Sequence, residues 1–311
     1  MSELITKASS INRALDQIGD KWCLLIIQEV FWGINTFNEM MKAMGVSRGV
    51  LSNRLKWLQG VDCLRRETSR GNKRPVYQLT CKTIGLYDCA LLAIRWERNW
   101  FQNAELDRVE LTHMLCGETF QPIIECASCD GEVAFSNVAY KPGPGAAIDV
   151  RGKKVRRRSS IAAASVPSQH ALYKNLINLV GDRWTANVIA LALHGLTRFE
   201  EFHSELPVAT NILSDRLRFL VREGVFEQVA YQQKPVRYSY QLTPMGKDLL
   251  PWFLALLRWG DLWCAPNALG PPMIVMHDDC GQELKAQVRC SQCRQELKAH
   301  EVNFALDSAV A

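Results

Sequence analysis

The strongest constraint on the fold is an internal repeat. The segment IGDKW at 18–22 returns as VGDRW at 180–184, and LSNRLKWL at 51–58 returns as LSDRLRFL at 213–220. The matching tryptophans and serines of these segments are 162 positions apart, and the QLT triplets that follow are 163 apart. Because order and spacing agree over so many residues, the chain contains two copies of one module.

The composition supports two folded modules. With 311 residues, 48% of them hydrophobic and 22% charged, the chain is typical of a globular protein large enough for two cores. No hydrophobic run reaches the ~18 residues that a membrane span needs, and the first residues lack the pattern of a secretory signal. We therefore expect a cytoplasmic protein without a membrane partner.

The repeat also predicts the domain boundaries. We expect a first module at 1–102, an extension at 103–138, a linker at 139–168, a second module at 169–264 and a second extension at 265–305. The linker is rich in Gly, Pro, Ser and Ala, which favours flexibility. Its basic run RGKKVRRR at 151–158 is either an arm that contacts DNA or a solvated segment, and the sequence leaves both interpretations open.

The hydrophobic pattern of the first module predicts a helix-turn-helix. Apolar spacing indicates helices near 11–18, over 22–31 and over 37–44. Ser47 can cap the next helix, whose Leu51, Leu55 and Leu58 would face the core. Two short strands, 64–68 and 76–79, would then enclose a basic turn, which is a wing, and Thr80 would begin one long final helix.

Charge is distributed unevenly between the copies. Residues 41–80 hold nine Lys or Arg against two acids, whereas residues 201–240 hold five of each. Basic side chains contact phosphates, and polar side chains at the start of an exposed helix read the major groove. We therefore expect the first copy to bind double-stranded DNA more tightly. The expected DNA contacts are Arg48, Ser52, Asn53, Arg54, Lys56, Arg70, Lys73, Arg74, Asn211, Ser214, Arg218, Lys234 and Arg237.

One pair of these positions has an alternative. Arg54 and its counterpart Arg216 lie beside the apolar stripe of their helices. They would equally suit ion pairs inside the module.

Each extension carries the pattern His-x2-Cys-x9-Cys-x2-Cys. Zinc prefers tetrahedral sets of thiolates and imidazole, and three cysteines with one histidine complete such a set. We expect two structural zinc sites, one in each extension, with ligands His113, Cys116, Cys126 and Cys129, and His277, Cys280, Cys290 and Cys293. A redox role for the Cys-x2-Cys pairs is the alternative, but it does not explain why the histidine and the first cysteine recur at the same distances.

These motifs together resemble a known family. The stretch ALDQIGDKWCLLIIQEV, followed by TFNEM, LSNRLKWL, the basic hairpin and QLT, is similar to the HxlR-type winged helix-turn-helix regulators of bacteria. The resemblance covers about 9–101 and 170–263, and it implies a mainly α (α+β) fold of two tandem winged helix-turn-helix modules. It also implies a DNA-binding transcriptional regulator, a repressor rather than an activator.

The resemblance further implies pairing of modules through their first and last helices. Most relatives have one module and dimerise, so the two modules of this chain would form either an internal pseudo-dimer or a homodimer. Many relatives begin the module with a sensor cysteine, but the corresponding residues are Ser9 and Ala171, so we expect no sensing there.

Other functions are weaker interpretations. The nearly neutral second copy could be a scaffold that binds protein or an effector. The sequence contains no phosphate loop, nucleophile elbow or HExxH motif, so we expect no enzyme. Thiol oxidoreductase chemistry at the Cys-x2-Cys pairs is the remaining enzymatic alternative.

Overall fold

The computed structural model describes residues 4–68, 75–151, 172–265 and 270–306. They form two compact units, and each unit combines segments from both repeats. The repeat-1 unit contains the described residues of 16–123, 162–181 and 288–311, and the repeat-2 unit those of 1–15, 124–161 and 182–287. The arrangement departs from the expected one, in which each repeat would form its own domain.

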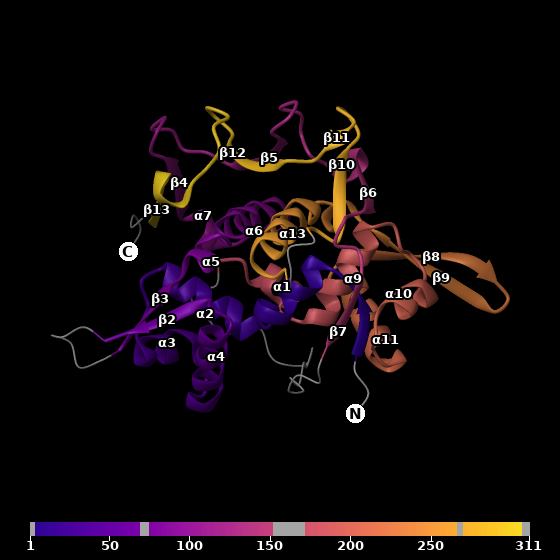
Figure 1. Ribbon diagram of the computed structural model, residues 1–311, viewed down its shortest axis with the longest axis horizontal. Coiled ribbons are helices and arrows are strands. Elements are labelled where there is room, and N and C mark those ends of the chain that lie inside the picture. The colour runs from indigo at the N-terminus through magenta and orange to yellow at the C-terminus, as the bar shows by residue number, and fades with distance from the viewer. Residues whose placement is uncertain (1–3, 69–74, 152–171, 266–269, 307–311) are drawn as a thin grey trace. The chain divides into compact units, whose positions relative to one another are not determined.

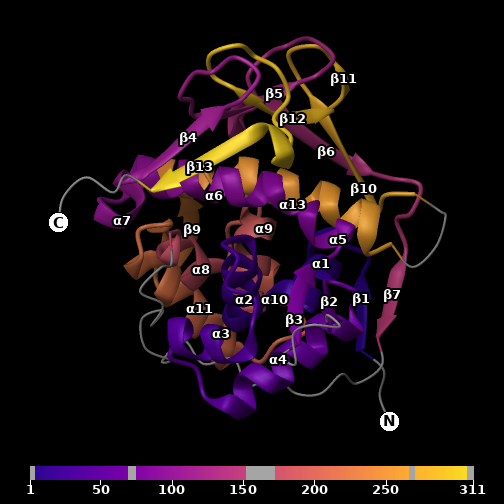
Figure 2. The same cartoon turned by 90° about the vertical axis from the view of Figure 1, so that its left-hand side faces the viewer.

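The repeat-1 unit is built around a helix-turn-helix and a hairpin. Its elements are α2 (Lys21–Phe31), α3 (Phe37–Met44), α4 (Arg48–Gly60), β2 (Leu64–Glu67), β3 (Val76–Leu79), α5 (Cys81–Ile84), α6 (Tyr87–Trp100), α7 (Ala104–Asp107), β4 (Val109–His113), α8 (Lys174–Val180), a 3-10 turn (Ala299–Glu301) and β13 (Val302–Leu306). β2 pairs antiparallel with β3. β4 pairs antiparallel with β13, as Figure 2 shows.

The repeat-2 unit repeats this plan. Its elements are β1 (Leu4–Lys7), a 3-10 turn (Phe135–Asn137), β6 (Val138–Pro142), β7 (Ile148–Arg151), α9 (Arg183–Leu193), α10 (Phe199–Glu205), α11 (Thr210–Arg222), β8 (Phe226–Gln233), β9 (Val236–Leu242), α12 (Pro244–Lys247), α13 (Leu250–Trp263), β10 (Met273–His277) and β11 (Gln282–Glu283). The β8–β9 hairpin projects beyond α10 and α11 of the same unit (Figure 1).

Three elements cross from one unit to the other along the chain. They are α1 (Ser10–Ile18), β5 (Pro122–Cys126) and β12 (Ala286–Cys290). β5 and β12 form a two-stranded sheet.

The two repeats exchange their first helices. In the repeat-1 unit, α8 of the second repeat contacts α2 and α6 of the first. In the repeat-2 unit, the backbone of Ser10 in α1 lies so close to Gly260 that a β-carbon there would come within 2.4 Å of the Ser10 carbonyl oxygen. The absence of a side chain at Gly260 therefore allows α1 to pack closely against α13.

The predicted core of the helix-turn-helix is confirmed. Leu51, Leu55 and Leu58 are at most 1% exposed, and Leu213, Leu217 and Leu220 of the second repeat are likewise buried. The strands of the first wing also lie where the pattern placed them.

The long helix predicted from Thr80 is wrong. Thr80 caps a single turn, α5, which ends at Gly85 before α6 begins. In the second repeat the same break precedes α13, whose first turn contains Pro251. A proline has no N–H to extend the preceding turn and is at home at the start of a helix, so it favours a new helix over continuation.

The predicted linker is shorter than expected. Residues 138–142 form β6, which pairs with β10, and residues 148–151 form β7, which pairs with β1. Most of the basic run at 151–158 lies outside the described residues, as does the rest of the predicted linker to residue 168. Among the helices that the structure describes, none has both the length and the hydrophobicity needed to cross a membrane.

Candidate functional site

Helix α4 of the first repeat and its counterpart α11 of the second are each held by one aspartate and one arginine. Asp20 caps α2 by accepting from the N–H groups of Trp22 and Cys23, at 3.1 and 3.3 Å. The same carboxylate accepts from Nε and Nη2 of Arg54 in α4, both at 2.8 Å. A two-point contact of this kind fixes the direction of the guanidinium as well as its distance. It therefore joins the start of α2 to the middle of α4.

The second repeat contains the same device. Asp182 caps α9 and accepts from Nε and Nη2 of Arg216, at 3.1 and 2.9 Å. Both arginines thus form the ion pair that the sequence offered as an alternative, and a DNA contact by Arg54 stays a prediction. Sequence reasoning missed Asp20 and Asp182, although their recurrence in both copies together with the arginines was a usable signal.

The remaining residues of α4 present a polar surface. Ser47 caps the helix by accepting from the N–H of Val50 at 3.4 Å. Arg48, Asn53 and Lys56 are exposed and Ser52 is half-buried. The Arg48 guanidinium also lies over the ring of Phe37, 5.6 Å from its centroid, which anchors it near the start of the helix.

Only some of the expected wing contacts lie within the described residues. Arg70, Lys73 and Arg74 of the first wing lie outside the described residues. Lys234 and Arg237 of the second wing are exposed. The second hairpin also exposes four large apolar or aromatic side chains, at 39–52% of their surface: Val229, Tyr231, Val236 and Tyr238.

The polar side chains of α11 are partly occupied within the helix. Asn211 is exposed, and the Ser214 hydroxyl donates to the Thr210 carbonyl at 2.9 Å. The Arg218 guanidinium pairs with the Asp215 carboxylate at 2.6 Å. A phosphate would have to compete with that carboxylate for Arg218.

Two clusters of three thiols and one imidazole form in the structure, and each draws ligands from both extensions. The first cluster, the His113 site, contains His113, Cys116, Cys290 and Cys293, all in the repeat-1 unit. The second, the His277 site, contains Cys126, Cys129, His277 and Cys280, all in the repeat-2 unit. All eight residues expected as ligands lie in the two clusters, but the expected grouping within one extension is wrong, because each His-x2-Cys segment meets the Cys-x2-Cys segment of the other copy.

The spacing of these atoms suits a tetrahedral metal ion. In the His113 site, Nδ1 lies 3.4 Å from Cys116 Sγ and 3.2 Å from Cys293 Sγ, and the Cys116 and Cys290 sulfurs are 4.0 Å apart. In the His277 site, Nδ1 lies 3.4 and 3.5 Å from the sulfurs of Cys129 and Cys280. Tetrahedral zinc with its usual bond lengths separates two sulfurs by about 3.8 Å and a sulfur from a nitrogen by about 3.6 Å.

Tight turns present the ligands. After each His-x2-Cys segment a glycine takes the left-handed conformation, Gly117 with φ 74° and Gly281 with φ 67°. The N–H groups of these glycines donate to the carbonyls of His113 and His277, both at 2.8 Å. Glycine tolerates this conformation without steric strain, which explains its place in the pattern.

Backbone hydrogen bonds also shift the pKa of the cysteine thiols in the two clusters. Burial alone would raise the pKa of the Cys126 thiol, but hydrogen bonds from the backbone, that of Ser128 first among them, lower this pKa to about 7. The pKa of Cys293 is lowered chiefly by a backbone hydrogen bond from Gln295. The pKa of the other cysteine of each pair, Cys129 and Cys290, is raised, so one thiol of each Cys-x2-Cys pair loses its proton more easily than the other. No disulfide occupies the sites, because all eleven cysteines are free.

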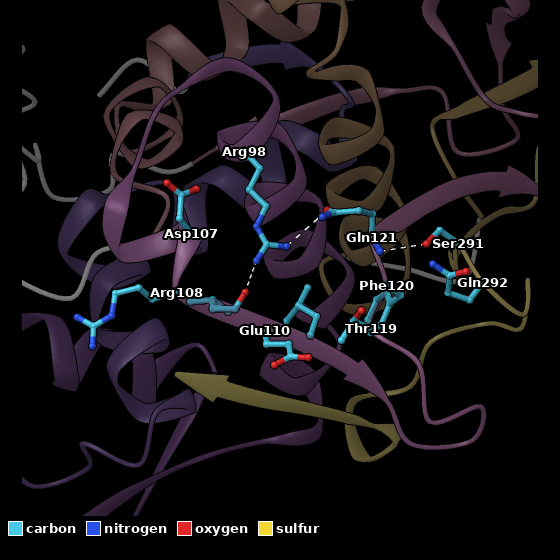
Figure 3. A pocket seen from close by; sticks show the side chains of 11 residues that line it. Arg98, Asp107, Arg108, Glu110, Thr119, Phe120, Gln121, Ser291 and Gln292 are labelled. Carbon is cyan, nitrogen blue, oxygen red and sulfur yellow. Dashed lines mark hydrogen bonds between the residues drawn. The ribbon is translucent and has the colours of Figure 1, made fainter. Parts of the chain in front are cut away.

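A pocket of about 660 Å³ adjoins the His113 site within the repeat-1 unit (Figure 3). Ser291 and Gln292, which separate Cys290 from Cys293, form part of its wall. The Ser291 hydroxyl accepts from the backbone N–H of Gln121 at 3.0 Å, and the Gln121 side chain accepts from Arg98 at 3.5 Å. Arg98 also donates to the carbonyl of Val109. Hydrogen bonds thus connect Arg98 in the pocket wall, through Gln121, to Ser291 in the turn between Cys290 and Cys293.

Known proteins share the helix-turn-helix modules. The HxlR-like helix-turn-helix family matches residues 17–105 and 179–268, more than half of the chain. An uncharacterized HTH-type transcriptional regulator of Mycobacterium tuberculosis is 36% identical over 126 residues, which are 40% of this chain and 79% of that protein. The uncharacterized HTH-type regulator YvaP of Bacillus subtilis is 33% identical over 98 residues, 31% of this chain and 91% of that protein.

A solved structure is also similar. The reduced form of the transcriptional regulator YodB from B. subtilis is 28% identical and covers 31% of this chain and 96% of its own, with a TM-score of 0.28. The repeat, the buried stripes of α4 and α11 and the match of both modules lead to one conclusion. The chain belongs to the HxlR-like helix-turn-helix family, whose relatives are named as transcriptional regulators.

Proposed function

We propose that the protein regulates transcription by binding duplex DNA, with α4 and the first wing as its main contact surface. The observation that carries this proposal is the α4 surface, where Arg48, Asn53 and Lys56 are exposed opposite a fully buried leucine stripe. A helix with one face in the core and a polar, basic face outside is suited to the major groove. As the mode of control we propose repression, which requires only that bound protein occupies DNA that the polymerase must use.

The second copy contributes less to DNA affinity. Residues 201–240 have no excess of positive charge, and Arg218 already pairs with Asp215. Affinity for DNA grows with the number of phosphates that basic side chains neutralise. The first copy therefore dominates binding.

The test uses the full chain, because each unit contains segments of both repeats. Genome-wide mapping of binding sites would supply an operator, and fluorescence anisotropy would give its affinity over a range of salt. We expect the double variant Arg48→Ala, Lys56→Ala to reduce the slope of log affinity against log salt by up to about 1.8, since each phosphate contact contributes about 0.9. The matched variant Arg218→Ala, Lys234→Ala should reduce it by less than half as much.

The variant Lys141→Ala is a control for loss of charge alone, because Lys141 is exposed in β6 and its removal also takes away one positive charge. Equal losses from the two double variants would contradict the dominance of the first copy. No loss from the α4 variant would contradict DNA recognition by that helix.

We also propose that both Cys3His sites hold structural zinc. Support comes from the near-tetrahedral distances and from the free state of all eleven cysteines. Elemental analysis of purified protein should find two zinc ions per chain. Protein that contains no zinc after purification in metal-containing medium would contradict this proposal.

We further propose that the modules pair within one chain as a pseudo-dimer. The exchange of first helices supports it, since Asp261 of α13 accepts a hydrogen bond from Ser10 of α1 at 2.5 Å and Glu97 of α6 binds the start of α8. Light scattering should give the mass of a single chain. A stable dimer at micromolar concentration would favour homodimerisation instead.

A second function is favoured for the second copy by one observation. Its hairpin exposes Tyr231 and Tyr238 beside Val229 and Val236, and exposed apolar side chains gathered on one element are typical of protein contacts. In that case this copy would act as a scaffold. The variant Arg218→Ala, Lys234→Ala would then leave operator affinity unchanged.

A further inference from the structure

The two metal sites have the same inner ligands but different surroundings. In both, three cysteine sulfurs and one imidazole Nδ1 converge, and both histidines are fully buried. The difference lies at the second ring nitrogen, Nε2, which points away from the metal position. When Nδ1 binds a metal, Nε2 carries the proton and needs an acceptor.

His277 has that acceptor. Its Nε2 lies 3.2 Å from the carbonyl oxygen of Glu132 and 3.5 Å from Oδ2 of Asp279. Asp279 is itself held by the side-chain amide of Asn137, which donates to it at 2.9 Å. The ring of His277 is therefore fixed in both tautomer and orientation.

His113 has none among the described residues. Its Nε2 is buried and has no hydrogen-bond partner, and its ring lies edge-on to Phe120 with the centroids 6.1 Å apart. The backbone acceptor of His277, Glu132, has a counterpart at the repeat spacing, Glu296, but the Nε2 of His113 makes no hydrogen bond to it. The carboxylate is absent by sequence, because the residue that corresponds to Asp279 is Leu115, which is 61% exposed. One copy thus has a carboxylate 3.5 Å from the histidine Nε2, and the other has no carboxylate at the corresponding position.

This difference affects metal affinity. Loss of the outer hydrogen bond of a metal-bound histidine typically weakens binding about 10- to 100-fold. The pocket beside the His113 site gives a chelator a route to the metal position. Ser291 and Gln292, which lie between Cys290 and Cys293, line this pocket. One observation argues against tighter binding at the His277 site, because its ligand Cys129 is exposed. Exposure of one sulfur mainly affects how fast a competitor reaches it, whereas the missing acceptor acts on the equilibrium.

We propose that the His277 site retains its metal and that the His113 site is an exchangeable zinc site, with Asp279 as the positioning residue that separates them. The repeat-1 unit, which also carries α4, therefore changes its metal content with the supply of zinc. The inference rests on the proposed zinc occupancy.

The experiment measures zinc affinity of each site in the full chain by competition with a chromophoric chelator. Cys116→Ser, Cys293→Ser leaves the His277 site, and Cys280→Ser, Cys129→Ser leaves the His113 site, so each variant removes one sulfur from each half of one site. We expect the His277 site to bind zinc 10- to 100-fold more tightly. Circular dichroism confirms that both variants are folded.

A reciprocal exchange then tests Asp279 itself. Leu115→Asp, in the variant that retains only the His113 site, should tighten zinc binding there, and Asp279→Leu should weaken the His277 site, each by at least about threefold. Asp278→Leu is the matched control, because Asp278 is an exposed neighbour. A purely structural role of position 115 would not produce a gain.

The outcomes separate the two proposals. Two zinc ions per chain with equal affinities, or with the tighter one at His113, would overturn this inference and leave the zinc sites intact. Wild-type protein without any zinc would overturn the proposed sites and this inference together.

Discussion

The carboxylate of Glu97 lies at the start of α8, where its Oε1 accepts from the backbone N–H and the side-chain amide of Asn175 at 3.3 and 2.7 Å. Its Oε2 accepts from the N–H of Leu176 at 3.3 Å. Burial raises the pKa of Glu97, and these hydrogen bonds from the start of α8 oppose that shift. One residue of the first repeat thus caps the exchanged helix of the second.

The variant Glu97→Ala should therefore destabilise the repeat-1 unit. Leaving the first N–H groups of α8 without an acceptor in a buried position should lower the free energy of unfolding by about 2 kcal/mol. Urea denaturation measures it. Glu110→Ala, which removes an exposed carboxylate from the same unit, should change stability by less than about 0.5 kcal/mol. Similar losses from both variants would show that Glu97 does not hold α8.

The crossed ligand sets predict an unusual pattern of zinc stoichiometry. Cys116→Ser, Cys293→Ser removes two ligands from one site and should leave one tightly bound zinc per chain. Cys116→Ser, Cys126→Ser removes two cysteines of the same extension and should weaken both sites. If ligands were grouped within an extension, elemental analysis would give the opposite result for the two variants.

Arg216 should matter far more for stability than its neighbour Arg218. The side chain of Arg216 is 7% exposed where it pairs with Asp182, whereas that of Arg218 is 72% exposed. Removing one partner of a buried pair leaves an uncompensated charge, so Arg216→Ala should cost about 3 kcal/mol. Arg218→Ala should cost no more than about 0.5 kcal/mol, because exposed pairs contribute little. Thermal unfolding followed by circular dichroism distinguishes them.

Helices α4 and α11 differ in the residue at the N-cap, and substitutions can exchange these two residues. Ser47 caps α4, but the corresponding Ala209 gives α11 no side-chain cap. Ala209→Ser should stabilise the repeat-2 unit by about 1 kcal/mol, and Ser47→Ala should destabilise the repeat-1 unit by a similar amount. A denaturant midpoint unchanged by Ala209→Ser would mean that another group already satisfies the first N–H groups of α11.

His194 should contribute a pH dependence. Burial lowers the pKa of His194 from 6.5 to about 4, and its ring lies against Tyr140 with centroids 4.4 Å apart. The unfolded chain therefore takes up this proton first as the pH falls. This stabilisation is present above about pH 6.5 and is progressively lost as the pH falls from 6.5 to 4, by about 3 kcal/mol.

The measurement compares unfolding free energies at pH 7 and 4.5. His194→Gln should lose less stability over this range than the wild type. His203→Gln, at an exposed position, should behave as the wild type does. Parallel pH profiles for all three proteins would contradict a role for His194.

Local patterns were enough to predict the helix-turn-helix. The leucines at 51, 55 and 58 defined the buried face of α4, and the run that carries Ser47 defined its start. Sequence also indicated all eight residues of the two Cys3His clusters, because the preferences of zinc concern residue types at short spacing. It could not decide which pairs meet, since both copies present the same half-sites and only the folded chain selects between identical partners.

Some residues were missed because their roles depend on contacts across the sequence. Arg54 is a basic residue, as a DNA contact often is, and its ion pair with Asp20 becomes visible only in the folded structure. Asp279 is one acid among many until His277 is found beside it. The break between α5 and α6 was missed because Gly85 and Leu86 leave the apolar spacing intact while the backbone changes direction.

The crossed ligand sets also govern the order in which the protein can mature during synthesis. The His277 site needs Cys280 and the His113 site needs Cys293, although their first ligands are made more than 150 residues earlier. A nascent chain that ends before residue 280 completes neither site, so its exposed thiols meet the cell without metal. Premature termination before residue 280 therefore yields a first repeat in which neither cluster has all four of its side chains.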